Sequence, residues 1–355
     1  MELKGNLMLV MGVFFTSVSS SVFAAPTLYG VLDGSVNFAS KDIGHNQLST
    51  IHDGASVTSN NSYLGVKGNE KLSDTLSIVY DAQWTINIDG DGSDFGQRDR
   101  YLGLKHEQLG TLSIGKLNTF LKRLGSIDLF DNYAANQLDI ANTFTGENRI
   151  NDGIQYQSPA IKVARGKINA NLQLFQGEGG VATNSGNAVG DGFGDAISAS
   201  ILYDNKAAGV NFALAYDSAV PSRWIGAGNA WAETNTVRAV ANMQAENLSL
   251  SALLQHAEVA ERRTASNVAV ADIESELGFA LGVLYKVGQT PWSVKGQFQQ
   301  GTTTFKTAHD IKAQQMAVGV DYQYNSNAKA YFYLAQHKLK DDDNRVGGLG
   351  LQYKF

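Results

Sequence analysis

The residues of this chain that could do chemistry are charged side chains within an alternating segment. Arg98 and Arg100 share one parity, opposite to Tyr101 and Gly103. Alternate residues of a strand point to opposite faces, and Tyr101 suits a lipid or interfacial face. We therefore expect both arginines to face water and Asp99 to point outward. Charges in this arrangement can steer ions, but they break no bonds.

Other chemistry has little support in the sequence. The absence of cysteine excludes thiol catalysis and thiolate metal sites, and the six histidines show no metal-ligand spacing. Residues 89–94 resemble the start of a calcium loop, but Asp94 replaces the required glycine and Arg100 replaces the final glutamate. Ser251 and His256 lack an orienting partner for nucleophilic catalysis. We expect no catalytic residue, no metal and no cofactor.

The elements that must position the charges are β-strands. In segment 74–86, leucine, isoleucine, tyrosine, alanine and tryptophan occupy the even positions from residue 76 onward, and mostly polar residues the odd ones. Such alternation is typical of strands with one face in lipid and one in water. We predict an all-β, 16-stranded antiparallel transmembrane β-barrel. Its expected strands are 27–38, 61–69, 74–86, 97–105, 110–117, 149–158, 166–176, 195–204, 208–217, 235–244, 247–257, 276–287, 291–300, 312–324, 328–338 and 346–355.

The connections between these strands alternate in length, as in membrane barrels with short turns on one side and long loops on the other. The predicted short turns are 107–109, 204–207, 245–246 and 325–327. The predicted long loops are 39–60, 118–148, 177–194, 218–234 and 258–275.

The two ends of the chain predict export and barrel closure. Lys4, the apolar run 7–15 and small residues up to Ala24 have the form of a secretory signal cleaved after Ala24. An N-terminal anchor is the alternative, but the run is shorter than the roughly 20 residues of a spanning helix. Residues 25–355 then form the barrel, and the last strand, which ends at Phe355, pairs with the first. The net charge of −6 and the lack of a basic stretch argue against nucleic acid.

Aromatic residues near strand ends predict belts at the two membrane surfaces. They are Tyr80, Trp84, Tyr101, Tyr285, Tyr322, Tyr324, Tyr331, Tyr333, Tyr353 and Phe355.

Several stretches together carry a family resemblance. They are 27–33 (Thr-Leu-Tyr-Gly-Val-Leu-Asp), 62–72 (Ser-Tyr-Leu-Gly-Val-Lys-Gly-Asn-Glu-Lys-Leu), 98–105 (Arg-Asp-Arg-Tyr-Leu-Gly-Leu-Lys), 112–119, 148–159 and the terminal strand. In their order and spacing the chain resembles the general diffusion porins of the Gram-negative outer membrane, most strongly the neisserial and β-proteobacterial type. The resemblance implies a homotrimer in outer-membrane lipid, passage of small hydrophilic solutes, and recognition of Phe355 by the barrel assembly machinery.

The resemblance also implies that the third external loop, 118–148, folds into the lumen and narrows it. Independently, this segment of ~30 residues is too long for an ordinary connection and too apolar for a disordered one. Its leucine, isoleucine and aromatic side chains need a surface to pack on, and the inner wall offers one. A lid packed outside over the mouth is the alternative.

The resemblance assigns the charges of this constriction. Arg98 and Arg149 correspond to the basic wall, with Lys116 and Arg123 as weaker additions. Asp128 and Asp131 fall near the acidic loop residues that face this wall, whereas ordinary solvated loop acids are the alternative.

Tyr63 stands where the family often has a basic residue, so we expect weak charge selectivity of either sign. A substrate-selective porin with a lumen binding site remains an alternative function. A non-conducting barrel enzyme or an adhesive or structural barrel is a more remote one.

Overall fold

The computed structural model describes residues 25–41, 51–178, 186–260 and 268–355. The predicted signal segment 1–24 lies outside the described residues. The strands are β1 (Thr27–Ala39), β2 (Gly54–Ser59), β3 (Tyr63–Lys71), β4 (Leu76–Thr85), β5 (Gln97–His106), β6 (Gly110–Asn118), β7 (Arg149–Gln157), β8 (Ile161–Val163), β9 (Gly166–Gln176), β10 (Phe193–Asn205), β11 (Val210–Trp224), β12 (Ala230–Ala245), β13 (Leu248–Val259), β14 (Ile273–Lys286), β15 (Trp292–Phe305), β16 (Ile311–Gln323), β17 (Ala328–Leu339) and β18 (Asp342–Lys354). Short helical turns are η1 (Lys122–Ile127), α1 (Tyr133–Asn136), η2 (Ile140–Asn142) and α2 (Val268–Ala271).

These segments form one closed antiparallel sheet with sixteen barrel strands, as predicted. Two barrel strands are each built from two segments. β2 pairs with the second half of β1, and β3 pairs with its first half. The break between them includes Asn61, whose φ of 58° is incompatible with an extended ladder. Likewise, β7 and β8 both pair with β9.

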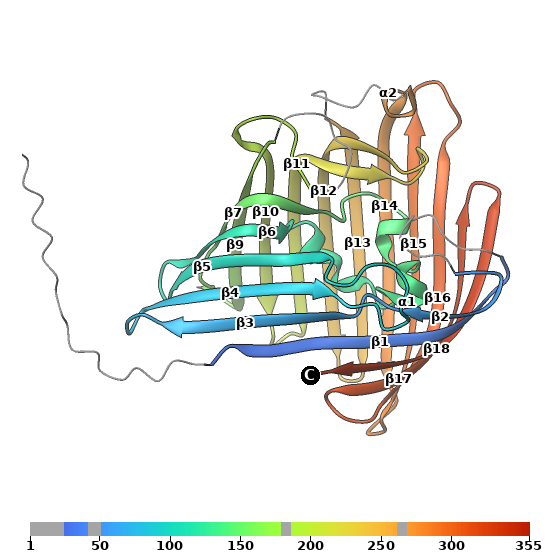
Figure 1. Cartoon of the computed structure of the whole chain (residues 1–355), viewed down its shortest axis with the longest axis horizontal. Coiled ribbons are helices and arrows are strands. Elements are labelled where there is room, and N and C mark those ends of the chain that lie inside the picture. The colour runs from blue at the N-terminus through green and yellow to red at the C-terminus, as the bar shows by residue number, and fades with distance from the viewer. Residues whose placement is uncertain (1–24, 42–50, 179–185, 261–267) are drawn as a thin grey trace, which may run out of the picture.

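The last strand closes the barrel on the first, and this confirms the predicted pairing (Figure 1). β18 runs antiparallel to β1 from Val31 opposite Lys354 to Phe38 opposite Gly347. Gly30 then exchanges two backbone hydrogen bonds with Phe355, at 3.0 and 3.1 Å. A sheet without a free edge leaves no unpaired backbone groups in lipid.

The two faces of the strands differ as the alternation predicts. Leu349 and Leu351 of β18 are 61% and 58% exposed on the outer face. On the opposite face of the wall, glutamine side chains such as Gln173, Gln297 and Gln299 are buried. This apolar-out, polar-in order is that of a membrane barrel. None of the helices in the described ranges is long and apolar enough to cross a membrane.

Several sequence predictions about this wall were wrong, and two concern its strands and aromatic residues. The long loop expected at 218–234 is a tall hairpin, because β11 continues to Trp224 and β12 begins at Ala230. A register shift between Asp217 and Val220 interrupts the alternation there and hides the strand. Tyr331 and Tyr333 are buried rather than part of an outer belt.

Candidate pore constriction

The segment between β6 and β7, residues 119–148 (the long loop), is bonded to the polar face of distant strands. The backbone N–H of Leu129 donates to Gln297 Oε1 at 2.6 Å, and Gln315 Nε2 donates to the Leu138 carbonyl at 2.6 Å. The N–H of Thr145 donates to Glu276 at 2.7 Å. Buried polar groups need partners, so these bonds satisfy loop backbone and wall side chains together.

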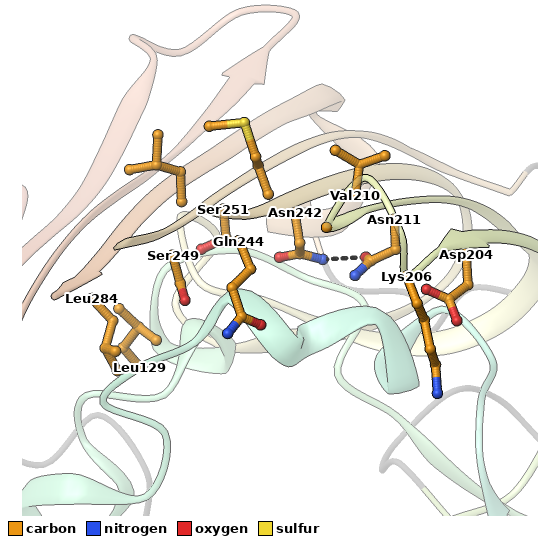
Figure 2. Close-up of a pocket in the computed structure, with 13 residues that line it drawn as sticks. Leu129, Asp204, Lys206, Val210, Asn211, Asn242, Gln244, Ser249, Ser251 and Leu284 are labelled. Carbon is orange, nitrogen blue, oxygen red and sulfur yellow. Dashed lines mark hydrogen bonds between the residues drawn. The ribbon is translucent and has the colours of Figure 1, made fainter. Parts of the chain in front are cut away.

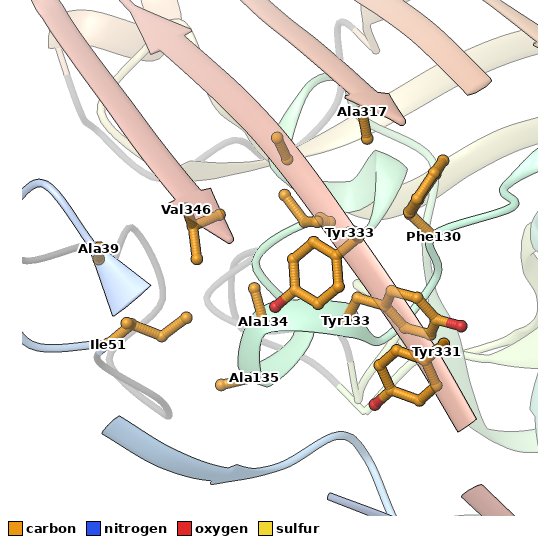
Figure 3. Close-up of a cluster of buried hydrophobic side chains, with 12 residues drawn as sticks. Ala39, Ile51, Phe130, Tyr133, Ala134, Ala135, Ala317, Tyr331, Tyr333 and Val346 are labelled. Atoms are coloured by element: carbon orange, nitrogen blue, oxygen red, sulfur yellow. The ribbon is translucent and has the colours of Figure 1, made fainter. Parts of the chain in front are cut away.

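The tip of the long loop packs into an aromatic cluster on the wall (Figure 3). Tyr133 stacks on Tyr331 with ring centroids 4.1 Å apart and lies 5.2 Å from the ring of Tyr333. Backbone φ angles of 55° and 53° at Ala134 and Ala135 make α1 a left-handed turn rather than a helix. Such a conformation is unfavourable for alanine and persists only where surrounding contacts hold it. The aromatic stack therefore fixes the loop tip.

The rest of the long loop covers a second apolar patch. Its Leu121, Leu124, Ile127, Ile140 and Phe144 pack against small or branched wall residues of β11 to β14. Phe144 lies directly over Gly278, where a methyl group would meet the ring at 2.9 Å. Burial of this kind contributes roughly 1.5–3 kcal/mol for each large side chain.

A buried ion pair anchors the end of the long loop. Arg238 of β12 donates to Glu147 at 2.6 Å, to the Leu121 carbonyl at 3.1 Å and to Gln255 at 2.8 Å. Burial raises the pKa of Glu147, while the Arg238 guanidinium lowers it. Nothing in the spacing of Glu147 along the sequence indicates a partner about ninety residues away.

The acidic residues of the long loop lie together. Oxygen atoms of Asp128, Asp131 and Asp139 lie within 4.8 Å of one another. Asp128 also accepts hydrogen bonds from the Ile140 N–H at 2.8 Å and from Gln297 at 2.9 Å. Because Asp128 and Asp139 already accept hydrogen bonds from loop backbone N–H groups, we assign no metal to the cluster.

The close approach of these three carboxyl groups favours their protonation. Burial and the Asp139 carboxylate raise the pKa of Asp128 to about 8. Although the Asp131 side chain is exposed, desolvation by the surrounding protein and the Asp139 and Asp128 carboxylates raise its pKa, and Asp131 hydrogen-bonds to Asp139. Like charges this close cannot all ionise, so the cluster holds protons near neutral pH.

The wall residue Arg98 lies against the tip of the long loop. Its guanidinium donates to Asn61, and Asn61 donates to Asn132 of the loop at 2.5 Å. Arg98 also lies over the Tyr63 ring at 4.8 Å. The structure thus links Arg98 to Asn132, the loop residue next to Asp131.

Arg149 is close to the wall but already paired. Its Nε donates to Asp99 Oδ1 at 2.5 Å, and Asn118 donates to Asp99 at 3.1 Å. Asp99 was expected to point outward, and instead it offsets the charge of Arg149.

Arg100 and Lys116 do not lie where the sequence placed them. They are direct partners in the β5–β6 ladder, which continues without a shift through Leu102 opposite Ile114. Those two side chains are 54% and 57% exposed on the outer face. Arg100 and Lys116 therefore point outward, away from the long loop.

The prediction that Tyr101 faces lipid was wrong and caused this error: Tyr101 alternates with the exposed Leu102 and so faces inward, which turns Arg100 outward. A bulge in β5 explains why Arg98 nevertheless faces the long loop. Ala82 of β4 pairs with Arg100, but Trp84 pairs with Gln97 rather than with residue 98. Two residues of β5 thus lie opposite one of β4, and the parity of the strand changes between Arg98 and Arg100. Strict alternation gives both arginines the same face and cannot detect an extra residue.

Three further cations were missed. Arg223 of β11 donates to the Ala141 carbonyl at 2.7 Å. Lys295 of β15 donates to the Leu129 carbonyl at 3.0 Å and pairs with Asp321 at 3.2 Å. Lys329 donates to the Tyr133 hydroxyl at 3.1 Å. Lys295 shares the parity of Gln297 and Gln299, so alternation could have placed it on the inner face.

A cavity of about 460 Å³, lined by both polar and apolar side chains, lies between the long loop and the short turns (Figure 2). Leu129 lines it from the loop. Asn211, Asn242, Gln244 and Ser249 line it from β11 to β13, and Asn242 donates to Asn211 at 2.7 Å. A hydrophilic solute could occupy this cavity together with water.

The comparisons identify the family. Residues 9–342 match the model of the Gram-negative porins. The chain belongs to the Gram-negative porin family. It is accordingly an outer-membrane channel for passive diffusion, and the predicted location in the outer membrane is confirmed.

This porin has relatives and structural neighbours of the same kind. The major outer membrane protein P.IB of Neisseria meningitidis serogroup B is 24% identical over 94% of this chain and 96% of the relative. The anion-selective porin from Comamonas acidovorans has a TM-score of 0.70 at 20% identity, covering 93% and 99% of the two chains. The trimer form of OmpT from Vibrio cholerae gives 0.61 at 14% identity, with the same coverage. At these identities the structures show the fold alone.

Proposed function

We propose that the long loop forms the constriction of this porin and that Arg98 and the acidic cluster set a weak charge preference there. The observation that carries the proposal is the link from Arg98 through Asn61 to Asn132, beside Asp131. It joins a wall cation to a loop whose backbone bonds to the polar face of β14 to β16. An inward position accounts for these contacts better than a lid over the mouth.

The size of the expected preference follows from Coulomb's law. Unit charges ~10 Å apart interact by about 0.4 kcal/mol in water and roughly 1.7 kcal/mol at an effective dielectric constant of 20. Arg149 is offset by Asp99, and the carboxylates of the cluster hold protons. Few net charges then act on a passing ion, so the preference should be modest.

We further infer a homotrimer in outer-membrane lipid, delivered by assembly machinery that reads Phe355. A trimer form of a structural neighbour with the same fold supports the oligomer. Phe355, where the last strand meets the first, is 42% exposed in the folded barrel, so a recognition factor can reach its side chain.

Planar-bilayer recording of the purified protein tests the constriction. Stable, nearly ohmic steps are expected, and Arg98→Ser should move the reversal potential toward cations. Arg345→Ser is the matched control, because Arg345 is a 73% exposed outer-rim cation. An equal shift in both variants would remove Arg98 from the constriction.

A second candidate is a substrate-selective porin whose binding site is the cavity beside Leu129. Asparagine, glutamine and serine side chains there could bind hydroxyl or amide groups of a solute. Saturable block of the current by one solute class would favour it, and loss of the block in Asn242→Ala would locate the site.

A further inference from the structure

Two cations face each other on the outer surface of the barrel. Arg100 and Lys116 are direct cross-strand partners, and both are partly buried. Partners in an antiparallel pair have Cβ atoms about 4.5–5.5 Å apart, and like charges so placed are destabilising. The repulsion is stronger near lipid, because the surroundings screen less than water.

No carboxylate in the described part of the chain is in an ion pair with Arg100 or Lys116. Two acids, Asp99 and Asp152, act on Lys116 through space without forming an ion pair with it, and Asp99 is paired with Arg149. In addition, Arg100 Nε has no hydrogen-bond partner. Within the described residues, the pair therefore has no carboxylate in direct contact.

The surroundings define which anion would fit. Arg100 lies 5.2 Å from the ring of Trp84, next to the last residue of β4, and so sits near the long-loop end of the wall. Below it, Leu102, Leu104, Leu112 and Ile114 are 48–57% exposed on the same face. Leu102 begins this apolar surface about 7 Å along the strand. A tryptophan and two cations above an aliphatic surface correspond to the headgroup level of a membrane.

We propose that Arg100 and Lys116 bind a phosphate group of an amphiphile in the outer leaflet, whose acyl chains cover the aliphatic residues below. One phosphate between the two cations replaces their repulsion by two charge-assisted contacts, and guanidinium matches phosphate geometry. The site is independent of the pore, because it lies on the opposite face of the wall.

A carboxylate of a second copy is the competing occupant. The observations favour the lipid, because the neighbours of the cations on this face are aliphatic and aromatic side chains, among them Leu102, Ile114 and Trp84, and include no carboxylate paired with them. Binding by a carboxylate of a second copy would show as dissociation of the oligomer when both cations are replaced.

The test compares three proteins refolded into phosphatidylcholine vesicles that contain bis-phosphorylated lipid A or the same lipid without phosphates. They are the unmodified chain, Arg100→Gln with Lys116→Gln, and Lys338→Gln with Arg345→Gln. The last pair is the control, since it removes two rim cations that already share Asp343, at 3.6 and 3.9 Å. Native mass spectrometry counts the lipid retained, and unheated gels report the oligomer.

The unmodified chain and the control should retain phosphorylated lipid roughly tenfold better than dephosphorylated lipid. Arg100→Gln with Lys116→Gln should abolish that difference and leave the oligomer and conductance intact. If the control variant lost the preference for phosphorylated lipid to the same extent, the lipid would be held by non-specific attraction to cations at the barrel rim. If millimolar inorganic phosphate displaced all of the retained lipid, the site would bind free anions rather than lipid. If the oligomer of the Arg100→Gln, Lys116→Gln variant dissociated, the occupant would be a carboxylate of a second copy. Each of these three results would overturn the proposal.

Discussion

Arg238 of β12 and Glu147 of the long loop form an ion pair of 2.6 Å in which the side chains are 0% and 8% exposed. The guanidinium also bonds to the Leu121 carbonyl near the other end of the loop. One wall residue therefore ties both ends of the long loop to the barrel. Its position predicts that loop docking and barrel stability are coupled.

Replacing Arg238 by methionine should destabilise the barrel by about 3–5 kcal/mol, because Glu147 is left buried without a counter-charge. Urea unfolding in vesicles measures this free energy. Arg238→Met combined with Glu147→Gln is the matched comparison and should recover more than half of the loss. A double variant as unstable as the single one would show that packing, not charge, is responsible.

Removing the Tyr133 ring should release the loop tip. Tyr133→Ala loses the stack on Tyr331 and should cost about 3–5 kcal/mol of docking free energy. Tyr133→Phe keeps the ring and loses only the hydroxyl that accepts from Lys295 and Lys329, so it should cost about 1 kcal/mol. Trypsin cleavage after Arg123 is the readout. If both variants are cleaved at the unmodified rate, the stack does not hold the loop.

Loop docking should weaken as pH rises. The pKa of Asp128 is raised to about 8 in the docked loop, against about 3.9 for an exposed aspartate. A raised pKa of an acid means that its contribution is complete below pH ~4 and is lost as pH rises through about 8. Open-channel current noise should therefore grow between these values. Asp128→Asn should flatten the curve, whereas Asp91→Asn, on an exposed loop, should leave it unchanged; a reversed slope would contradict this assignment.

Barrel closure should depend on Gly30. A methyl group there would approach the Tyr63 carbonyl at 2.6 Å and the Phe355 ring at 2.7 Å. Gly30→Ala should therefore slow or block assembly, seen as loss of the compact form on unheated gels. Gly34→Ala is the control, since its nearest neighbour is the flexible end of Ile88 at 2.8 Å. Normal assembly of both variants would show that the seam tolerates a side chain.

The sequence by itself determined the barrel, its number of strands and its closure. Period-two alternation is a local property, and each face must suit lipid or water regardless of which strand lies beside it. The long loop could also be predicted, because so long a segment with many apolar side chains needs a surface to pack on. In contrast, the extension of β11 and β12 into a long hairpin was not predicted, because the register shift near Asp217 interrupts the alternation.

Only the tertiary structure decided which charges meet. The bulge between Arg98 and Arg100 turns one arginine toward the long loop and the other toward lipid, and one extra residue leaves no mark on the alternation. Asp99 with Arg149 and Glu147 with Arg238 join residues 50 and 91 positions apart. Such pairs depend on which strands are neighbours around the closed sheet, and side-chain spacing along the chain does not contain that information.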